Sequence, residues 1–297
     1  LRRHTRFGFK SRGLGDVYKR QAVNSDTTSA TPRINQMIRV RYGMVLYRMF
    51  ASITYVSSSE KGHGGVRDLK VATWNIRKCI GLDRRRDPHR TARVISSLAA
   101  DVVVLQEADK RLGRRPAALR PELIASETGM TAVDAGGHEP SIGWHGNAVL
   151  VSNRITVDDV HQVHLPGIEP RGALVVDLFA GSQPLRIVAV HLGFLRRMRR
   201  AQLATIRARL DALDHRATAI LGDFNEWSPT TGLEPLVGYH IHTPGNTFHA
   251  ARPVAPLDRI AVSNSVTLSD PLIVSNRLTR VASDHLPVKA TLTLETV

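Results

Sequence analysis

The chain has 297 residues, 42% of them hydrophobic, which is enough for a sizeable core in one large or two small domains. Its single cysteine, Cys79, excludes an intrachain disulfide, so a reducing compartment is compatible and we expect a cytoplasmic protein. The formal net charge of +15 suggests a partner that carries phosphate groups, but this charge is unevenly distributed.

The first 67 residues carry most of the excess charge. Residues 1–67 contain 13 Lys and Arg against 3 Asp and Glu, whereas residues 68–297 contain 28 against 23. The first segment follows no helical or strand period, and residues 57–65 are rich in Ser and Gly, as in a linker. We therefore interpret residues 1–67 as a basic leader, disordered or non-native, and residues 68–297 as the functional domain.

Membrane insertion is not expected, and neither is an assembly of several copies. No apolar run approaches the roughly eighteen residues that a spanning helix needs, so we predict no transmembrane segment. We expect a monomer.

Several apolar runs in the domain have the length and composition of strands, and each delivers a polar side chain near one end. Residues 69–76 contain Asn75, residues 101–107 end on Glu107, residues 187–192 contain His191, and residues 256–260 carry Asp258. Residues 147–151 and 172–176 are further expected strands. Because strand ends hold side chains on a rigid frame, we expect these polar groups to share one site.

Two helices are predicted between the strands. Asp87 followed by Pro88 is typical of a helix start, and an apolar stripe of Val94, Ile95 and Leu98 then predicts a helix over residues 88–100. A second helix is predicted from about residue 197 to 213, with Leu203, Ile206, Leu210 and Leu213 on one face. The arginines of its other face are expected to be solvated.

Two short runs near the C-terminal third are the most informative. Gly222-Asp223-Phe224-Asn225 follows an apolar run, and Ser283-Asp284-His285 precedes another. On an extended chain, residues two apart point to the same side, so Asp223 and Asn225 could reach one centre together. The alternative is an ordinary turn, because Gly, Asp and Asn are common turn residues.

Six motifs in one order carry a family resemblance. They are Thr73-Trp74-Asn75-Ile76, Leu105-Gln106-Glu107, Val190-His191-Leu192, Gly222-Asp223-Phe224-Asn225, Leu257-Asp258-Arg259-Ile260 and Ser283-Asp284-His285. This set resembles the endonuclease/exonuclease/phosphatase superfamily typified by DNase I, in its branch of small bacterial metal-dependent hydrolases, over about residues 68–297. The resemblance implies an α/β (α+β) fold, a four-layer sandwich of two mixed β-sheets face to face with helices outside. It also implies metal-dependent hydrolysis of phosphodiesters or phosphomonoesters.

The polar residues of these motifs suit a hard metal ion. Asn75, Glu107, Asp223, Asn225 and Asp284 all offer oxygen, which favours Mg²⁺ or Mn²⁺ over zinc. By resemblance, Glu107 and Asn75 hold the main metal, while Asp223 and Asn225 position the nucleophile and the phosphate. We predict the metal ligands to be Asn75, Glu107, Asp223 and Asp284.

His285 and Asp258 are predicted to form an acid–base pair. A carboxylate bonded to one imidazole nitrogen fixes the tautomer and supports positive charge on the ring, so His285 could activate water or hold a phosphoryl oxygen. By resemblance, His191 is a second acid–base group, a position that the exonuclease III-like branch does not fill in this way. Its carboxylate partner cannot be identified from spacing. The predicted catalytic residues are His191, Asp223, Asn225, Asp258 and His285.

The predicted substrate is a phosphate ester, and three substrate-binding residues are proposed. Asn147, Arg171 and Asn225 match positions where hydrolases of the superfamily contact phosphate, and a guanidinium such as that of Arg171 suits bidentate phosphate binding. Aromatic residues make up only 5% of the chain, whereas sequence-tolerant nucleic-acid binders stack bases on aromatic rings. A small-molecule or phospholipid head-group phosphodiester is therefore favoured.

Two alternatives remain open. A DNase I-type endonuclease would use a basic groove, for which the sequence offers Arg84, Arg85, Arg86, Arg114 and Arg115. The more remote alternative is a binding module without activity on the same fold.

Overall fold

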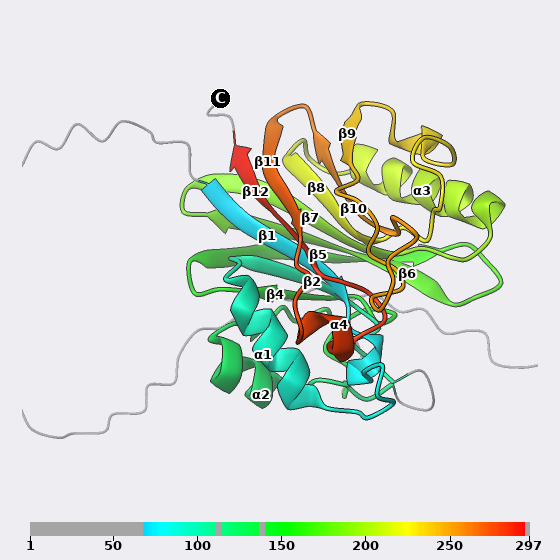
Figure 1. Ribbon diagram of the computed structural model, residues 1–297. Helices are drawn as coiled ribbons and strands as arrows, with labels where there is room; N and C mark the ends of the chain where they lie inside the picture. Colours follow the sequence, from blue (N-terminus) through cyan, green and yellow to red (C-terminus); the bar gives the residue numbers. More distant parts are fainter. Residues whose placement is uncertain (1–67, 111–114, 137–139, 295–297) are drawn as a thin grey trace, which may run out of the picture. The chain divides into compact units, whose positions relative to one another are not determined.

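The computed structural model describes residues 68–110, 115–136 and 140–294 (Figure 1). The predicted leader, residues 1–67, lies outside this part of the chain. The described residues form two six-stranded mixed sheets packed face to face with helices on the outside, which confirms the predicted four-layer sandwich.

The first sheet has its outer face covered by α1 (Pro88–Leu98), α2 (Pro121–Thr128) and the short α4 (Thr279–Ala282). The 3₁₀ turn η1 (Arg77–Cys79) follows its central strand. In spatial order its strands are β11 (Val266–Ile273), β12 (Val288–Leu294), β1 (Asp68–Asn75), β2 (Val102–Gln106), β4 (Ala148–Val151) and β3 (Thr131–Ala132).

The second sheet is covered on its outer face by α3 (Arg196–Asp211), and η2 (Glu234–Leu236) packs beside that helix. In spatial order its strands are β5 (Ile155–Leu165), β6 (Arg171–Ala180), β7 (Gln183–His191), β8 (Ala217–Asp223), β10 (Asp258–Ser263) and β9 (Tyr239–His242).

Strand alternation divides the apolar side chains among the layers. In β1, Val71 packs in the core between the sheets, whereas Ala72 and Trp74 pack toward α1. In β8, Ala219 and Leu221 face the core between the sheets, and Ile220 packs toward α3. Successive residues of a strand point to opposite faces, so every second residue shares one environment.

The same alternation decides where the polar strand ends point. Asn75 is in phase with Val71, His191 with Ile187 and Ala189, and Asp223 with Ala219 and Leu221. These side chains therefore continue the inner faces of the two sheets at the end of the core between them.

Gly222 permits close approach of β8 to β7. A Cβ atom added at this position would lie 1.9 Å from the carbonyl oxygen of Val190, a distance that no side chain can tolerate. The glycine of the Gly222-Asp223-Phe224-Asn225 motif is therefore required for the two strands to stay together where Asp223 leaves the sheet.

The predicted helices are present with slightly shorter ends. Asp87 accepts a hydrogen bond from the backbone N–H of Arg90 (2.9 Å), which confirms it as the N-cap of α1, and Ala99 ends this helix in the left-handed conformation. The long edge strand β5 was not predicted, because polar residues occur on both of its faces and obscure the alternation of apolar and polar residues that is typical of a strand. No helix among the described residues is long and apolar enough to cross a membrane.

Candidate active site

Three neighbouring strands of the second sheet place three titratable side chains in one row. His191 of β7 is paired in register with Asp223 of β8, and Asp223 is paired with Asp258 of β10. All three residues are buried. The carboxylate of Asp223 lies 3.4 Å from Nε2 of His191, so the structure supplies a carboxylate neighbour for His191 that spacing could not identify.

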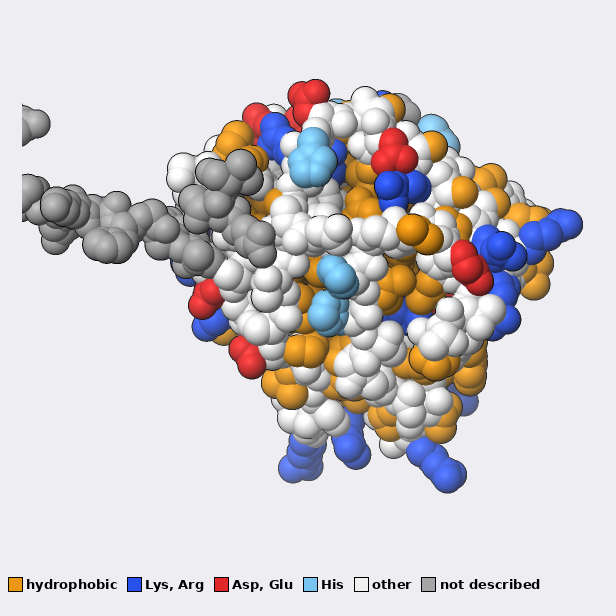
Figure 2. Space-filling model, turned by 90° about the horizontal axis from the view of Figure 1, so that it is seen from above, with side chains coloured by type: hydrophobic (Ala, Val, Ile, Leu, Met, Phe, Trp, Pro, Cys, Tyr) orange, Lys and Arg blue, Asp and Glu red, His pale blue; other side chains and the backbone are white. Residues whose placement is uncertain are grey.

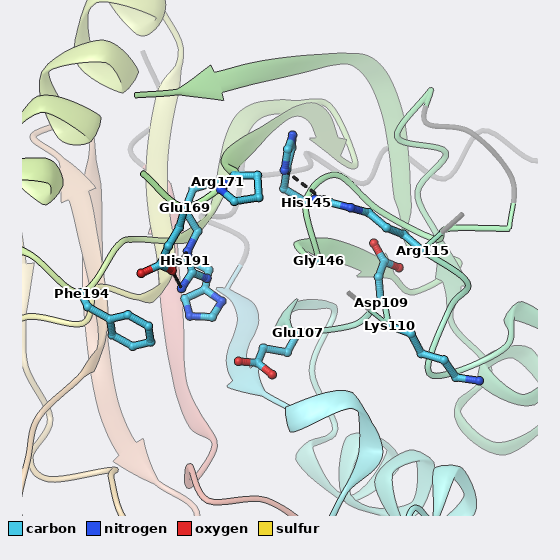
Figure 3. Close-up of a pocket in the computed structure, with 11 residues that line it drawn as sticks. Glu107, Asp109, Lys110, Arg115, His145, Gly146, Glu169, Arg171, His191 and Phe194 are labelled. Carbon is cyan, nitrogen blue, oxygen red and sulfur yellow. Dashed lines mark hydrogen bonds and ion pairs between the residues drawn. The ribbon is translucent and has the colours of Figure 1, made fainter. Parts of the chain in front are cut away.

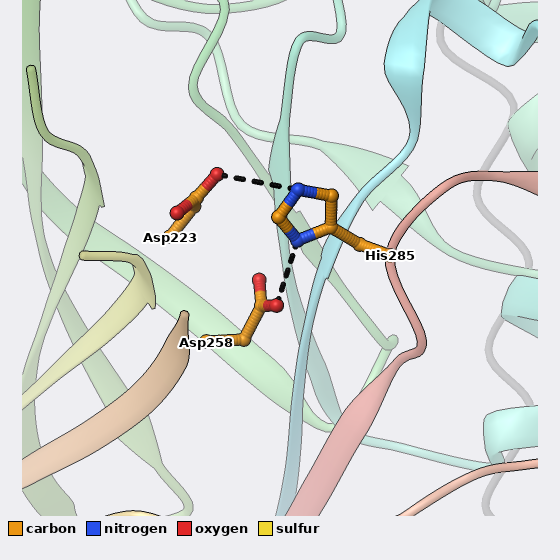
Figure 4. Close-up of side chains that lie close together, drawn as sticks. All are labelled: Asp223, Asp258 and His285. Carbon is orange, nitrogen blue, oxygen red and sulfur yellow. Dashed lines mark hydrogen bonds and ion pairs between the residues drawn. The ribbon is translucent and has the colours of Figure 1, made fainter. Parts of the chain in front are cut away.

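His285 lies between the two carboxylates of this row (Figure 4). Its Nδ1 is 2.8 Å from Oδ2 of Asp258, which confirms the predicted hydrogen bond, and its Nε2 is 3.7 Å from Oδ2 of Asp223. The hydroxyl of Thr247 also donates to Oδ2 of Asp258 (2.5 Å). Sequence analysis did not identify Thr247, since a lone threonine outside any motif gives no signal.

Two long-range hydrogen bonds hold the segment that carries His285. The indole N–H of Trp74 donates to the carbonyl of His285 (2.9 Å), and the hydroxyl of Ser283 donates to the carbonyl of Asn75 (2.7 Å). Trp74 and Ser283 are fully buried. The end of β1 and the segment before β12 are therefore fixed to each other at the site.

The cluster is electrostatically coupled. Burial raises the pKa of Asp223 to about 6, an effect that Asp258 adds to and His285 opposes. Burial alone would lower the pKa of His285, but the carboxylates of Asp258 and Asp223 outweigh it and raise this pKa to about 10. At neutral pH the ring of His285 is therefore an imidazolium, a hydrogen-bond donor at both nitrogens.

The two asparagines contact this cluster in different ways. The amide of Asn75 donates to Oδ2 of Asp223 (3.1 Å), as expected for strand ends that meet. Asn225 is close to Asp223, but not along an extended chain: β8 ends at Asp223, and Asn225 adopts a left-handed turn with φ of 51°. Its backbone N–H donates to Asp223 (2.9 Å) and its side chain donates to the carbonyl of Leu192 (2.8 Å).

Two of the predicted metal ligands, Glu107 and Asp284, form ion pairs with cationic side chains from η1. The ammonium of Lys78 forms an ion pair with Glu107, and Nε of Arg77 lies 3.3 Å from Asp284. Two basic residues of a single turn thus lie against two of the predicted metal ligands. Sequence analysis did not anticipate Lys78, although it lies only two residues after the Trp74-Asn75-Ile76 motif.

Metal-ligand geometry can be tested on the same residues. Asp223, Asp258 and His285 offer ligand atoms that lie within 4.8 Å of one another, close enough for one ion. However, Nδ1 of His285 is already hydrogen-bonded to Asp258, and Mg²⁺ and Mn²⁺ prefer oxygen ligands to an imidazole nitrogen. We therefore expect a cation at Glu107 and Asp284, where oxygens already attract positive charge, rather than on His285.

A cavity of about 190 Å³ opens beside this cluster (Figure 3). Glu107 and His191 line one part of it, and Phe194 turns its ring toward the same space. Its other lining residues include the cations Lys110, Arg115 and Arg171 and the carboxylates Asp109 and Glu169. His145 lines it too, and burial and the nearby Arg115 lower the pKa of its ring. The three cations offer contacts for an anionic group.

Of the predicted substrate-binding residues, Arg171 lines the cavity and Asn147 does not. Arg171 lines the cavity, but its Nε and one terminal nitrogen both donate to the carboxylate of Glu169 (3.2 and 2.8 Å). Asn147 is fully buried, and its amide donates to the carbonyl of Gly172 (2.8 Å); its neighbours His145 and Gly146 line the cavity instead. Phosphate contact by either residue remains a prediction.

The basic groove of the alternative nuclease hypothesis is divided. Arg115 lines the cavity and donates to Nδ1 of His145 (3.0 Å), an interaction that sequence analysis did not anticipate. Arg86 donates to the carbonyl of Lys78 (3.0 Å) and so supports η1, while Arg84 and Arg85 are exposed. Arg114 lies outside the described residues.

A buried ion network supports the segments that follow His191 and Asn225. Glu226 is fully buried and accepts hydrogen bonds from Arg196 (2.8 and 3.0 Å) and Arg199 (2.6 Å) of α3. Arg199 also donates to the carbonyls of Gly193 and Phe194. Burial would raise the pKa of Glu226, but the two arginines outweigh it and lower this pKa to about 2.

The fold and this geometry together define a class of protein. Two face-to-face mixed sheets end in a buried cluster of carboxylates, imidazoles and amides beside a cavity lined by both cationic and anionic side chains. Comparison with known proteins then gives the family. Residues 72–285 match the model of the Endonuclease/Exonuclease/phosphatase family.

Individual relatives agree with this match. The uncharacterized protein YbhP of Escherichia coli (strain K12) is 30% identical over 248 residues, which are 75% of this chain and 95% of YbhP. An endonuclease/exonuclease/phosphatase from Beutenbergia cavernae DSM 12333 has a similar structure, with a TM-score of 0.58 and 26% identity over 77% of this chain and 72% of that one. The human Nocturnin catalytic domain with bound sulfate has a TM-score of 0.60 and 18% identity, over 77% and 95%.

The chain belongs to the endonuclease/exonuclease/phosphatase family. Members of this family are generally hydrolases of phosphate ester bonds and commonly use divalent metal ions.

The charge state of His285 can be measured directly. In metal-free protein we expect its ring to stay protonated until the pH approaches about 10, and Asp258→Asn should return its pKa toward the ordinary 6.5. Because the folded-state pKa is raised, this charge contributes stability below pH 6.5 that is lost as the pH rises toward 10. Ring ¹⁵N shifts of labelled histidine, assigned with His285→Gln, provide the measurement. A wild-type ring that titrates near 6.5 would contradict the coupling.

The ion network under the site can be tested through stability. Glu226→Gln leaves Arg196 and Arg199 without a counter-charge and should cost about 3 kcal/mol of unfolding free energy at pH 7, measured by urea denaturation. Because the pKa of Glu226 is lowered, the difference from wild type should shrink as the pH falls from 4.5 toward 2. Glu234→Gln, which alters an exposed partner of Arg200, is the matched control and should unfold like wild type. Equal effects of the two substitutions would argue against a supporting role of Glu226.

Proposed function

We propose that this protein is a divalent-metal-dependent phosphodiesterase that acts on a small-molecule or phospholipid head-group substrate. The observation that carries the proposal is the position of the cavity, whose lining includes Lys110, Arg115 and Arg171. The cavity adjoins Glu107 and His191, and His191 in turn lies against the buried cluster of Asp223, Asp258 and His285. An anionic ester held in the cavity would therefore lie next to the groups that hydrolysis needs.

The residues present suit Mg²⁺ or Mn²⁺. Glu107 and Asp284 would hold the ion together with Asn75. The ion would displace the side chains of Lys78 and Arg77 from these two carboxylates. A bound ion would supply charge neutralisation at the phosphoryl oxygens.

The charge states divide the work between the other residues. Asp223, with a pKa of about 6, is ionised at neutral pH and basic enough to accept a proton from an attacking water. His285 is an imidazolium, so we assign it to hold a phosphoryl oxygen rather than to activate water. Asp258 fixes the ring, and His191 lies against Asp223 and the cavity, where it can exchange a proton with the leaving group.

Cavity size and lining favour a compact anionic substrate. About 190 Å³ is at the small end for a ligand pocket and suits one substituent beside the phosphate. Arg171 and Arg115 reach this space from two sides, and Phe194 provides an apolar wall (Figure 3).

Metal dependence is the first test. Hydrolysis of bis-p-nitrophenyl phosphate should require Mg²⁺ or Mn²⁺, and Glu107→Ala should lower kcat/KM by at least about a hundredfold through loss of the ion. Glu122→Ala, an exposed glutamate at the start of α2, is the matched control and should keep full activity. Calorimetric titration with Mn²⁺ should show binding to wild type and none to Glu107→Ala. Full activity in excess EDTA would refute metal dependence.

The substrate class is tested by direct comparison. We expect poor turnover of plasmid DNA, abasic duplex and RNA, and better turnover among phosphatidylglycerol, cardiolipin, sphingomyelin and phosphoinositides. Each substrate is assayed with wild type and with His285→Ala, which separates turnover at this site from a contaminating nuclease. If plasmid DNA is cleaved fastest, and the substitution abolishes this cleavage, the endonuclease alternative is correct.

A further inference from the structure

Large hydrophobic side chains are exposed on three loops bound to the start of α3, two of which also contribute residues to the cavity lining. Ile168 is 81% exposed, Leu195 57% and Trp227 58%; we call these three residues the apolar rim. They lie on the turn between β5 and β6, the loop between β7 and α3, and the loop after β8. Monomeric proteins seldom gather such side chains beside a binding site unless another surface covers them.

The rim is held rigidly, because all three loops are bound to the first turns of α3. The side chain of Gln202 accepts from the N–H of Gly193 (2.9 Å) and donates to the carbonyl of Pro166 (2.9 Å), which joins the first two loops. Arg199 binds both Gly193 and Glu226, which joins the third. Buried polar groups thus fix exposed apolar ones in place.

Positive charge lies beside the rim. Arg196, Arg197 and Arg200, which we call the rim arginines, are exposed on the first turns of α3. Arg196 also donates to Glu226, and Arg200 lies 3.4 Å from Glu234. Seen from above, basic and hydrophobic side chains gather together at the right-hand edge of the molecule (Figure 2), the side on which α3 begins in Figure 1. Apolar side chains flanked by arginine are the combination that binds the interface of an anionic bilayer.

The rim also leads into the cavity. Phe194, the neighbour of Leu195, lines the cavity, and the guanidinium of Arg171 lies 5.6 Å from the centre of its ring. A surface docked on the rim would therefore lie next to the predicted phosphate site.

We propose that the apolar rim and the rim arginines dock this protein on an anionic phospholipid bilayer, so that a head-group phosphodiester enters the cavity past Phe194. This inference rests on the proposed function and specifies its substrate as one presented at a membrane surface. Single-stranded nucleic acid would use arginine and Trp227 too, but it binds by stacking on aromatic rings. The aliphatic Ile168 and Leu195 offer no ring for base stacking, whereas contact with lipid uses all three side chains of the rim.

Vesicle sedimentation tests the surface without catalysis. The full chain carrying Glu107→Ala should sediment with phosphatidylglycerol/phosphatidylcholine vesicles. Adding Ile168→Ser, Leu195→Ser and Trp227→Ser should weaken binding about a hundredfold, since three apolar side chains lose their burial. Leu272→Ser on β11, 51% exposed, is the matched control and should bind as before. All variants carry the same residues 1–67, so the charge of that segment cannot explain a difference.

Fluorescence places Trp227 independently. Trp74 is buried and Trp144 half-buried, so brominated phosphatidylcholine in the vesicles should quench mainly Trp227, and Trp227→Phe should remove this quenching. Wild-type binding by the triple-serine variant, or the absence of quenching, overturns the docking surface. Loss of oligonucleotide binding in that variant, with no vesicle binding by its parent, overturns it in favour of nucleic acid.

The outcome is separable from that of the proposed function. The three rim side chains do not line the cavity, so in an otherwise wild-type chain the triple-serine variant should hydrolyse bis-p-nitrophenyl phosphate at the wild-type rate. Vesicle binding without hydrolysis of any ester would support the surface and refute the activity. Hydrolysis of the soluble ester with wild-type vesicle binding in the triple-serine variant would do the reverse.

Discussion

Two carboxylates buried side by side set the conditions for the rest of the site. Asp223 and Asp258 are neighbours across β8 and β10, both almost completely buried, and two like charges so placed cannot both be ionised without compensation. The ring of His285 between them supplies it. The contacts of Trp74, Ser283 and Thr247 hold this one cationic ring in place. Carboxylates are also paired with cations at Glu107 and Asp284, which form ion pairs with Lys78 and Arg77.

Much of the fold and the site could be predicted because the strands carry both. An apolar run that ends in a polar residue specifies an element, its buried face and the direction of its last side chain. Asn75, His191 and Asp223 follow the inner-face phase of their strands, so the pattern of residues alone indicates a shared site. The hydrogen bond between His285 and Asp258 was predicted for the same reason, since each lies at the edge of an apolar run.

Features that depend on turns and on tertiary pairing could not be predicted. Asn225 reaches Asp223 through a left-handed turn, the alternative that the Gly, Asp and Asn of this motif left open, and the sequence alone did not decide between the turn and an extended chain. The amide of Asn147 is directed to Gly172 because the residue before β4 lies next to β6, not by its own motif. One buried ion pair does have a signal in the sequence. Arg199 lies four residues before Leu203, on the apolar stripe of α3, where a charged residue requires a buried partner. That this partner is Glu226 depends on how α3 crosses the sheet.

The pairing of β1 with β12 has a consequence for how the protein is made. Of the strands in this sheet, the ribosome releases β1 first and β12 last, and the hydrogen bond from Trp74 to His285 joins residues 211 positions apart. A nascent chain therefore already contains Asn75, Glu107 and Asp223 while its first sheet still lacks two adjacent strands, and it has no ring to neutralise the paired carboxylates. The cluster assembles only after the segment that carries His285 has left the ribosome. Translation products that stop before this segment are thereby prevented from forming the site in the cell.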